Sequence, residues 1–435
     1  MDEFPGISLI TLGCSKNLVD SEFLLNRLKT NGYNVKHEDV KNGDILIINT
    51  CGFINDAKQE SIETILNYAE ERKLGNIKQL VVMGCLSQRY QKELKKEIPE
   101  VDRFFGVDEL PGIVEYLKGS NNTHNPHKRF LTKPTHYSYL KIAEGCNRKC
   151  AFCSIPFIRG SYKSKSIETL SSEANLLSQD GVKELNLIAQ DLSYYGYDRY
   201  KEYLLPKLLE KLAEMNAFNW IRLLYNYPSQ FPKKVLEIMD KFPAICNYLD
   251  IPFQHISDPV LKKMRRGISK KHTIELIEYI KSAIPNFTLR TTLMVGHPGE
   301  GESEFNELLD FVKNTEFDRL GVFTYSEEEG TYSARKYENI IPDKVKQERA
   351  DELMNIQRSI SRKKNENKIG SNLDVLIDSE DEHYYYGRTE ADAPEVDNSV
   401  MIEKKDETLN KIAVGDFYRV NITTAYDYDL LGIVV

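Results

Sequence analysis

The sequence predicts an α/β protein with three parts: an N-terminal α/β domain with a parallel sheet, a central partial (β/α) barrel, and a small antiparallel β-barrel at the C-terminus. Up to residue 367, apolar runs typical of buried strands alternate with helical stretches, a pattern that indicates parallel sheets. From residue 368 onward, apolar and polar residues alternate, as Val420 and Ile422 do with Asn421, and no helical stripe is present. We therefore expect domains at 1–118, 137–367 and 368–435, joined by a linker at 119–136.

Length and composition agree with this division. A chain of 435 residues has room for about three domains, and 41% hydrophobic with 29% charged residues is typical of a globular protein. No apolar run approaches the roughly 18 residues that a membrane span needs, and residues 1–5 are acidic where a secretory signal is basic. We therefore expect a cytoplasmic protein that does not bind membranes.

The N-terminal domain begins with three predicted βα units. Between the second and third strands, Ile62, Ile65, Leu66 and Ala69 form the stripe of an amphipathic helix. Each of the three strands ends directly before a cysteine: residues 7–13 before Cys14, 44–50 before Cys51, and 80–84 before Cys85. The spacings, 51 − 14 = 37 and 85 − 51 = 34, are each close to one βα repeat of roughly 30 residues.

Three residues at three parallel strand ends meet at the edge of the sheet where such folds bind ligands. For one cysteine alone, an ordinary buried side chain is the more common explanation. For Cys14, Cys51 and Cys85 at equivalent positions, metal ligation is favoured. An odd and sparse count of seven cysteines also suits metal ligands better than a disulfide framework.

A second group of cysteines follows the first strand of the central domain. Cys146, Cys150 and Cys153 have the spacing C-x₃-C-x₂-C on one short loop. A structural zinc site is the alternative, but zinc is closed by four ligands, and His255 and His297 are remote in sequence. Three thiolates on a short loop instead suit a [4Fe–4S] cluster whose fourth iron is open and can bind a substrate.

The cysteine loop, with the aromatic Phe152 before its last cysteine, resembles the signature of the radical S-adenosylmethionine superfamily. Five later segments fit the strands of its partial barrel: 184–189, 221–225, 248–252, 288–295 and 321–325. The three N-terminal cysteines narrow the resemblance, within this superfamily, to the methylthiotransferases. The chain resembles the branch of that family that acts on a ribosomal protein, in the segments 11–22, 49–54, 84–90, 144–147, 155–156, 159–160, 189–191, 252–255 and 295–300. The likeness covers the whole chain, with one departure at His297, where Phe is usual.

This resemblance implies two [4Fe–4S] clusters, one on Cys14, Cys51 and Cys85 and one on Cys146, Cys150 and Cys153, of which the second binds S-adenosylmethionine. The implied reaction adds a methylthio group to the β-carbon of an aspartate of ribosomal protein S-twelve, free or on the small subunit. A low-potential donor such as flavodoxin or ferredoxin is implied as the reductant. Cys246 fits neither set and is expected in the core. Our candidates for contacts with S-adenosylmethionine, with a structural polar network or a solvated face as the alternatives, are Gln190, Arg222, Gln254 and Arg290.

The C-terminal segment resembles the TRAM domain, an oligonucleotide-binding-like module that contacts RNA in relatives acting on transfer RNA. Residues 368–435 hold 15 acidic and 6 basic residues, a net charge of −9, whereas RNA binding needs Lys and Arg. Direct nucleic-acid binding is therefore not expected, and a cationic protein substrate is favoured, although acidic residues also serve solubility. Two alternatives stay open: a transfer-RNA (adenosine) methylthiotransferase, and a non-enzymatic iron–sulfur scaffold or electron carrier.

Overall fold

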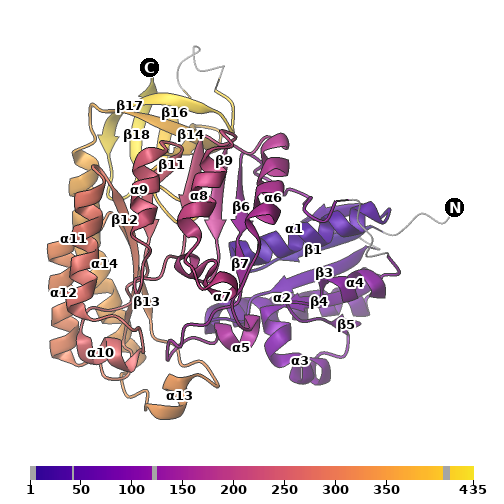
Figure 1. Ribbon diagram of the computed structural model, residues 1–435. Coiled ribbons are helices and arrows are strands. Elements are labelled where there is room, and N and C mark those ends of the chain that lie inside the picture. The colour runs from indigo at the N-terminus through magenta and orange to yellow at the C-terminus, as the bar shows by residue number, and fades with distance from the viewer. Residues whose placement is uncertain (1–5, 42–43, 120–124, 405–411) are drawn as a thin grey trace.

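The computed structural model describes residues 6–41, 44–119, 125–404 and 412–435. The N-terminal stretch 1–5, and residues 120–124 of the predicted linker, lie outside the described residues. The chain forms an N-terminal sheet, a central barrel and a C-terminal barrel (Figure 1). No helix among the described residues has the length and apolar character that crossing a bilayer requires.

The N-terminal domain is built on a five-stranded parallel sheet, as predicted, in the order β2-β1-β3-β4-β5. The central strand is buried along its whole length, because helices cover both faces of the sheet. The strands are β1 (Ile7–Thr11), β2 (Val35–His37), β3 (Ile45–Thr50), β4 (Gln79–Gly84) and β5 (Arg103–Phe104).

Two helices pack on each face of this sheet. α1 (Ser15–Thr30) and α4 (Leu110–Tyr116) cover one face, and α2 (Asn55–Lys73) and α3 (Cys85–Glu97) cover the other. The predicted stripe on α2 is only half buried, because Ile65 and Ala69 pack on the sheet while Ile62 and Leu66 are exposed. Ile62 instead lines a surface groove between α2 and α3.

The central domain is an open barrel of six strands, all parallel, in the order β6-β9-β10-β11-β12-β13. This confirms the predicted partial (β/α) barrel. Its strands are β6 (Tyr137–Lys141), β9 (Glu184–Ile188), β10 (Trp220–Leu223), β11 (Ile245–Asp250), β12 (Thr288–Val295) and β13 (Arg319–Thr324). The short strands β7 (Ala143–Glu144) and β8 (Lys163–Ser164) pair beside it.

Helices surround the barrel strands, and short helices lie at the end where the strands finish (Figure 1). The surrounding helices are α6 (Ile167–Gln179), α8 (Leu205–Ala213), α9 (Lys234–Lys241), α11 (Lys270–Ala283), α12 (Glu302–Thr315) and α14 (Asp343–Glu366). The short ones are α5 (Ile155–Arg159), η1 (Leu192–Tyr194), α7 (Tyr197–Tyr200), α10 (Asp258–Lys263) and α13 (Tyr332–Lys336).

The C-terminal domain is a closed five-stranded barrel in the order β14-β15-β16-β18-β17. The prediction of an antiparallel barrel is correct for four of the strand pairs, but β16 and β18 are parallel. A closed ring with an odd number of strands cannot alternate direction at every pair, so one parallel pair is required. The strands are β14 (Asn372–Glu380), β15 (Tyr384–Arg388), β16 (Val400–Glu403), β17 (Phe417–Ala425) and β18 (Leu430–Val434).

The C-terminal barrel packs against the start of the central strands, at the opposite end from α5, α10 and α13 (Figure 1). Glu184, the first residue of β9, is fully buried and accepts from Arg222 at 2.8 Å and from Arg388 at 2.7 Å. Burial works to raise the pKa of Glu184, but the two guanidinium groups outweigh it and hold the pKa below its usual value. A second buried pair joins Arg319 to Asp392. Part of the acidic charge of this domain therefore stabilises the domain interface.

Candidate functional site

The three N-terminal cysteines lie at the carboxyl edge of the parallel sheet, as predicted. Cys14 caps the amino end of α1, Cys51 directly follows β3, and Cys85 is the first residue of α3. The positive ends of two helix dipoles therefore point toward the same region, which favours negatively charged groups there.

Gly13 allows these strand ends to approach closely. Its φ is +91°, and a Cβ at this position would lie 2.7 Å from the Cβ and 3.0 Å from the Sγ of Cys51. No other residue fits without displacing the cysteine, because such contacts are far below van der Waals distance. Glycine therefore leaves room for the side chain of Cys51 beside Cys14.

The thiols influence one another electrostatically. Burial raises the pKa of Cys85 to about 12 against the opposing charge of Arg159, and the charges of Cys14 and Cys51 raise it further. At Cys14, burial also works to raise the pKa, but Lys16 and Arg159 outweigh it, and the pKa lies below its usual value. Lys16 and Arg159 thus both lower the pKa of Cys14, and Arg159 also opposes the rise at Cys85.

The second cysteine loop, residues 146–153, joins β7 to α5 and forms backbone hydrogen bonds with other segments, among them those at Gly160 and Met264. The Cys146 N–H donates to the Gly160 carbonyl at 3.1 Å, and the Ala151 N–H donates to the Met264 carbonyl at 2.8 Å. Gly145, at φ +77°, begins this turn, and a Cβ there would lie 2.3 Å from the Ser161 carbonyl oxygen. The loop geometry therefore depends on glycine.

Hydrogen-bond donors surround the sulfur atoms of this loop. Arg266 is buried and donates to Cys150 Sγ at 3.3 Å. The Tyr227 hydroxyl, which donates to the carbonyl oxygen of Arg266 at 2.6 Å, lies 3.5 Å from the same sulfur. The backbone N–H of Arg148 donates to Cys146 Sγ at 3.4 Å. Such donors stabilise thiolates and tune the potential of a cluster that they hold. Sequence reasoning missed Arg266 and Tyr227, because nothing in their local pattern distinguishes them from other polar residues.

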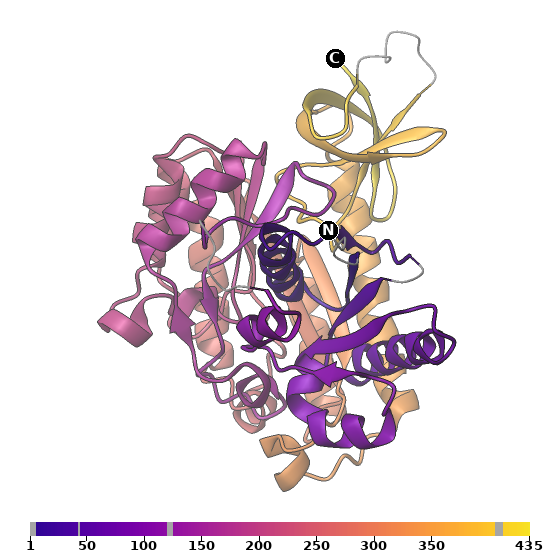
Figure 2. The same ribbon diagram turned by 90° about the vertical axis from the view of Figure 1, so that its right-hand side faces the viewer.

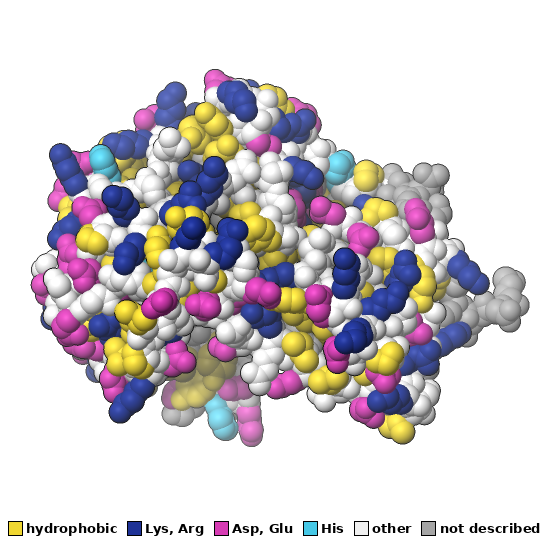
Figure 3. Space-filling view, turned by 90° about the horizontal axis from the view of Figure 1, so that it is seen from below, with side chains coloured by type: hydrophobic (Ala, Val, Ile, Leu, Met, Phe, Trp, Pro, Cys, Tyr) yellow, Lys and Arg dark blue, Asp and Glu magenta, His cyan; other side chains and the backbone are white. Residues whose placement is uncertain are grey.

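A cavity of about 440 Å³ opens beside the loop. It is lined by all three cysteines and by the cations Arg148, Lys149, Arg265 and Arg335. Figure 3 views this face from below and shows that Lys and Arg side chains gather on it.

Each of the two donor sets consists of three cysteine thiols, and thiolates are the ligands that hold four-iron clusters. Among the described residues, no three His, Cys, Asp or Glu side chains have the arrangement that one metal ion needs. A cubane cluster spaces its ligands more widely than a single ion does, since each thiolate binds a different iron. Near the barrel loop, buried oxygen atoms of Gln190 and Asp191 have no hydrogen-bond partner and are available to a bound group.

The four predicted contacts with S-adenosylmethionine separate into two pairs. Gln190 donates to Glu144 at 3.0 Å beside the cysteine loop, and Gln254 follows β11 at the same end of the barrel. Arg222 is fully buried against Glu184 and also donates to the carbonyl oxygen of residue 390 in the C-terminal domain.

Arg290 belongs with Arg222 rather than with the two glutamines. It pairs with Asp250 at 3.0 Å and with Asp397 of the C-terminal domain at 3.2 Å. The contacts of both arginines favour the structural network that was one of the alternatives at these two positions.

Two other residues from the sequence prediction lie outside both sites. Cys246 is fully buried among apolar side chains, as predicted, and burial raises its pKa to about 12. His297 is buried against the edge of Phe152, and its Nε2 lies 3.0 Å from Ser333 Oγ. Burial lowers the pKa of His297 to about 4, so this ring is neutral at pH 7 and fills the place of the usual aromatic side chain.

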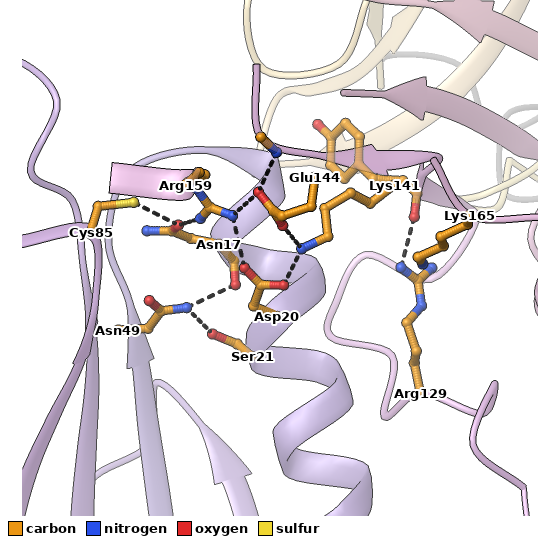
Figure 4. A network of polar contacts seen from close by, with 12 residues as sticks. Asn17, Asp20, Ser21, Asn49, Cys85, Arg129, Lys141, Glu144, Arg159 and Lys165 are labelled. Atoms are coloured by element: carbon orange, nitrogen blue, oxygen red, sulfur yellow. Dashed lines mark hydrogen bonds and ion pairs between the residues drawn. The ribbon is translucent and has the colours of Figure 1, made fainter. Parts of the chain in front are cut away.

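A buried polar network links the two cysteine sets (Figure 4). Asn17 Oδ1 lies 3.8 Å from Cys85 Sγ and accepts from Arg159. Arg159 also donates to Glu144, two residues before Cys146, at 2.9 Å. The sequence stretch 159–160 carried the family likeness, but it gave no indication that Arg159 reaches the N-terminal cysteines.

The fold and the three-cysteine loop define a radical S-adenosylmethionine enzyme. The model of the Radical SAM superfamily matches residues 140–312, that of the uncharacterized protein family UPF0004 matches 7–106, and that of the TRAM domain matches 369–435. The fold resembles that of the radical S-adenosylmethionine methyltransferase TsrM from Kitasatospora setae, with a TM-score of 0.57 and 12% identity over 76% of this chain and 77% of the other.

The more similar relatives match along nearly the whole chain. A ribosomal protein uS12 methylthiotransferase RimO from Bacteroides fragilis is 49% identical over 99% of both chains. A protein of the same name from Phocaeicola vulgatus is 50% identical over 98% of both chains. The chain belongs to the ribosomal protein uS12 methylthiotransferase RimO family, and it is a radical S-adenosylmethionine methylthiotransferase with a C-terminal TRAM domain.

Proposed function

We propose that this chain adds a methylthio group to the β-carbon of an aspartate of ribosomal protein uS12, in the cytoplasm, with two [4Fe–4S] clusters. The observation that carries this proposal is the presence of two sets of three cysteine thiols, linked through Arg159. Three protein thiolates leave one iron of each cluster open, so each site can bind a further ligand. The names of the relatives support uS12 as the substrate. We retain 1–118, 137–367 and 368–435 as the proposed domains, with the linker at 119–136.

At the barrel site, Cys146, Cys150 and Cys153 would hold the cluster. With S-adenosylmethionine bound there and one electron from a low-potential donor, the site would supply radical chemistry that can remove hydrogen from an unactivated carbon. Arg266 and Tyr227 orient the thiolate of Cys150 through their contacts with its sulfur. We propose Gln190 and Gln254 as contacts of S-adenosylmethionine.

At the N-terminal site, Cys14, Cys51 and Cys85 would hold the second cluster, which supplies the sulfur. Asn17 orients Cys85, and its amide donates to the carbonyl oxygens of Leu12 and Thr50, which fixes the ends of two strands. These contacts support the proposal, because they hold two strand ends and Cys85 together within the N-terminal domain.

The charge of the TRAM domain favours a protein substrate over transfer RNA. Its net charge of −9 repels phosphates and attracts a cationic ribosomal protein. Part of this charge is unavailable to a partner, since Asp378, Asp392 and Asp397 pair with basic side chains in buried or partly buried contacts. Glu380 is exposed but pairs with Lys404 at 2.6 Å, and the exposed acidic side chains that remain include Glu382. The domain therefore still favours a cationic partner, but the negative charge available to that partner is smaller than the net charge of −9 indicates.

A low-potential protein such as flavodoxin or ferredoxin is our proposed electron donor, and the cationic cavity at the barrel cysteines is its proposed docking face. Replacing Arg265 and Arg335, both exposed there, by Glu should slow cluster reduction by an acidic flavodoxin about tenfold or more at low salt, because like charges repel. Reduction by dithionite should be unchanged. The measurement is the rate of loss of cluster absorbance under anaerobic stopped flow.

The matched control replaces Lys271 and Lys344, whose exposed side chains lie on α11 and α14 outside the cavity, by Glu. This control changes the net charge equally and should leave the rate unchanged. Equal slowing in both variants would assign the effect to net charge and contradict docking at the cavity.

The substrate proposal is tested by mass spectrometry of uS12 from cells that lack the gene. The target aspartate should be unmodified in these cells, and the wild-type gene should restore the methylthio group. A Cys150→Ala gene should not restore it. Normal uS12 together with missing methylthio groups on transfer-RNA adenosines would favour the transfer-RNA alternative.

A further inference from the structure

Arg159 is a buried cation that contacts both cysteine-bearing regions. It ends α5, which begins two residues after the cysteine loop of the barrel. Its guanidinium donates to Asn17 Oδ1, an atom that also lies within 3.8 Å of the Cys85 thiol. Its Nη1 atom donates to Glu144 at 2.9 Å on the other side (Figure 4). The side chain is 2% exposed, so solvent screens these contacts little.

The charges around Arg159 are arranged with a direction. Asp20 on α1 of the N-terminal domain and Glu144 beside the barrel both accept from Arg159, and Lys141 pairs with both carboxylates. These four side chains sum to zero charge. Arg159 is the member that reaches the thiols, because it donates to Asn17 Oδ1, which lies 3.8 Å from Cys85 Sγ. The neutral set therefore presents its positive end to the N-terminal site.

We propose that Arg159 is a positioning residue that presents positive charge to the cluster held by Cys14, Cys51 and Cys85, and that it thereby stabilises an anionic sulfur ligand there. This inference rests on the proposed assignment of two clusters. Through its bond to Glu144, the same guanidinium fixes that site against the cysteine loop of the barrel.

The physical reason is the cost of buried negative charge. Three thiolates make a four-iron cluster anionic, and a further sulfide or thiolate adds charge that must be compensated away from water. Lys16 is the other nearby cation, but its ammonium group lies over the ring of Tyr225, 3.2 Å from the centroid. Arg159 shares an acceptor atom with Cys85, and its planar fork can serve Asn17 and Glu144 together.

A purely structural ion pair between the domains is the competing explanation. It predicts that loss of Arg159 lowers stability and leaves the properties of the N-terminal cluster unchanged. Arg129 provides a matched control, because its side chain is fully buried between the same two domains, where it pairs with Glu22 and Glu173 and contacts no cysteine that the structure describes.

The test uses full-length protein in which Cys146, Cys150 and Cys153 are Ala, so that only the N-terminal cluster is loaded. In this background, Arg159→Gln should weaken binding of the probe methanethiolate about tenfold. It should also lower the equilibrium constant for one-electron reduction of the cluster about tenfold, which shifts the reduction potential about 59 mV in the negative direction. Arg159→Lys should keep most of the thiolate affinity and of the reduction potential, and Arg129→Gln should change neither quantity. Electron paramagnetic resonance during a redox titration measures the potential, and thiolate titration measures the affinity.

A second variant, which keeps the Arg159 cation, tests the direction in which charge shifts the reduction potential. Glu144→Gln leaves Arg159 less neutralised, so the potential should shift in the positive direction. Unchanged potential and affinity in Arg159→Gln, or unchanged potential in Glu144→Gln if Arg159→Gln does not fold, would overturn the inference. Failure of the background protein to bind iron at all would instead contradict the proposed second cluster.

Discussion

Replacing Cys146, Cys150 and Cys153 by Ala is expected to remove about half of the iron from anaerobically reconstituted protein and to abolish reductive cleavage of S-adenosylmethionine. The intact protein should hold about eight irons, in two four-iron clusters. The N-terminal thiols lie in a separate domain with its own sheet and its own core, so their cluster should still assemble. Iron analysis and chromatography of 5′-deoxyadenosine provide the two measurements.

Cys246→Ala is the matched control for this experiment. Cys246 is fully buried in an apolar cluster that contains none of the other six cysteines, and it should be dispensable for both clusters. This variant should keep about eight irons and normal cofactor cleavage. Full iron retention in the triple variant would contradict the assignment of the barrel loop as a cluster site.

The second large effect separates radical formation from sulfur transfer. With Cys14, Cys51 and Cys85 replaced by Ala, the protein should still form 5′-deoxyadenosine under reducing conditions but should transfer no methylthio group. The barrel loop keeps its supports in this variant, since its backbone bonds go to Gly160 and Met264 of its own domain. Chromatography of the nucleoside and mass spectrometry of uS12 from one reaction report both steps.

If methylthio product still forms in that variant, the sulfur does not come from the N-terminal site. Loss of both activities would have a different meaning, namely that the polar network through Arg159 also supports the barrel site. The single variant Arg159→Gln distinguishes these outcomes, because it breaks the polar network and leaves all six thiols in place.

The strand positions and the two cysteine sets could be predicted from sequence because their signals are local. Each N-terminal cysteine follows a strand, and parallel strands bring such residues to one edge whatever the loops do between them. Glycines at Gly13 and Gly145 mark the tight turns beside the sites, where positive φ is required. The parallel pair β16–β18 follows from barrel closure, which the alternation of residues along single strands does not indicate.

Contacts between domains could not be predicted in the same way. Arg222 and Arg290 lie on barrel strands, as cofactor contacts would, but carboxylates and a carbonyl group from distant segments engage them. Likewise, Arg159 reaches Asn17 only because two domains pack together. A single sequence carries no periodic signal for contacts across domains: Arg222 and residue 390, Arg290 and Asp397, and Arg159 and Asn17 are separated by 168, 107 and 142 residues.

The most direct test combines the reconstituted enzyme with S-adenosylmethionine, a low-potential reductant and purified uS12, with transfer RNA in a parallel reaction. Tandem mass spectrometry should find one hydrogen on the β-carbon of one uS12 aspartate replaced by a methylthio group. The transfer RNA should be unchanged. Unmodified uS12 beside 5′-deoxyadenosine formation, with methylthio groups on transfer-RNA adenosines, would contradict this account.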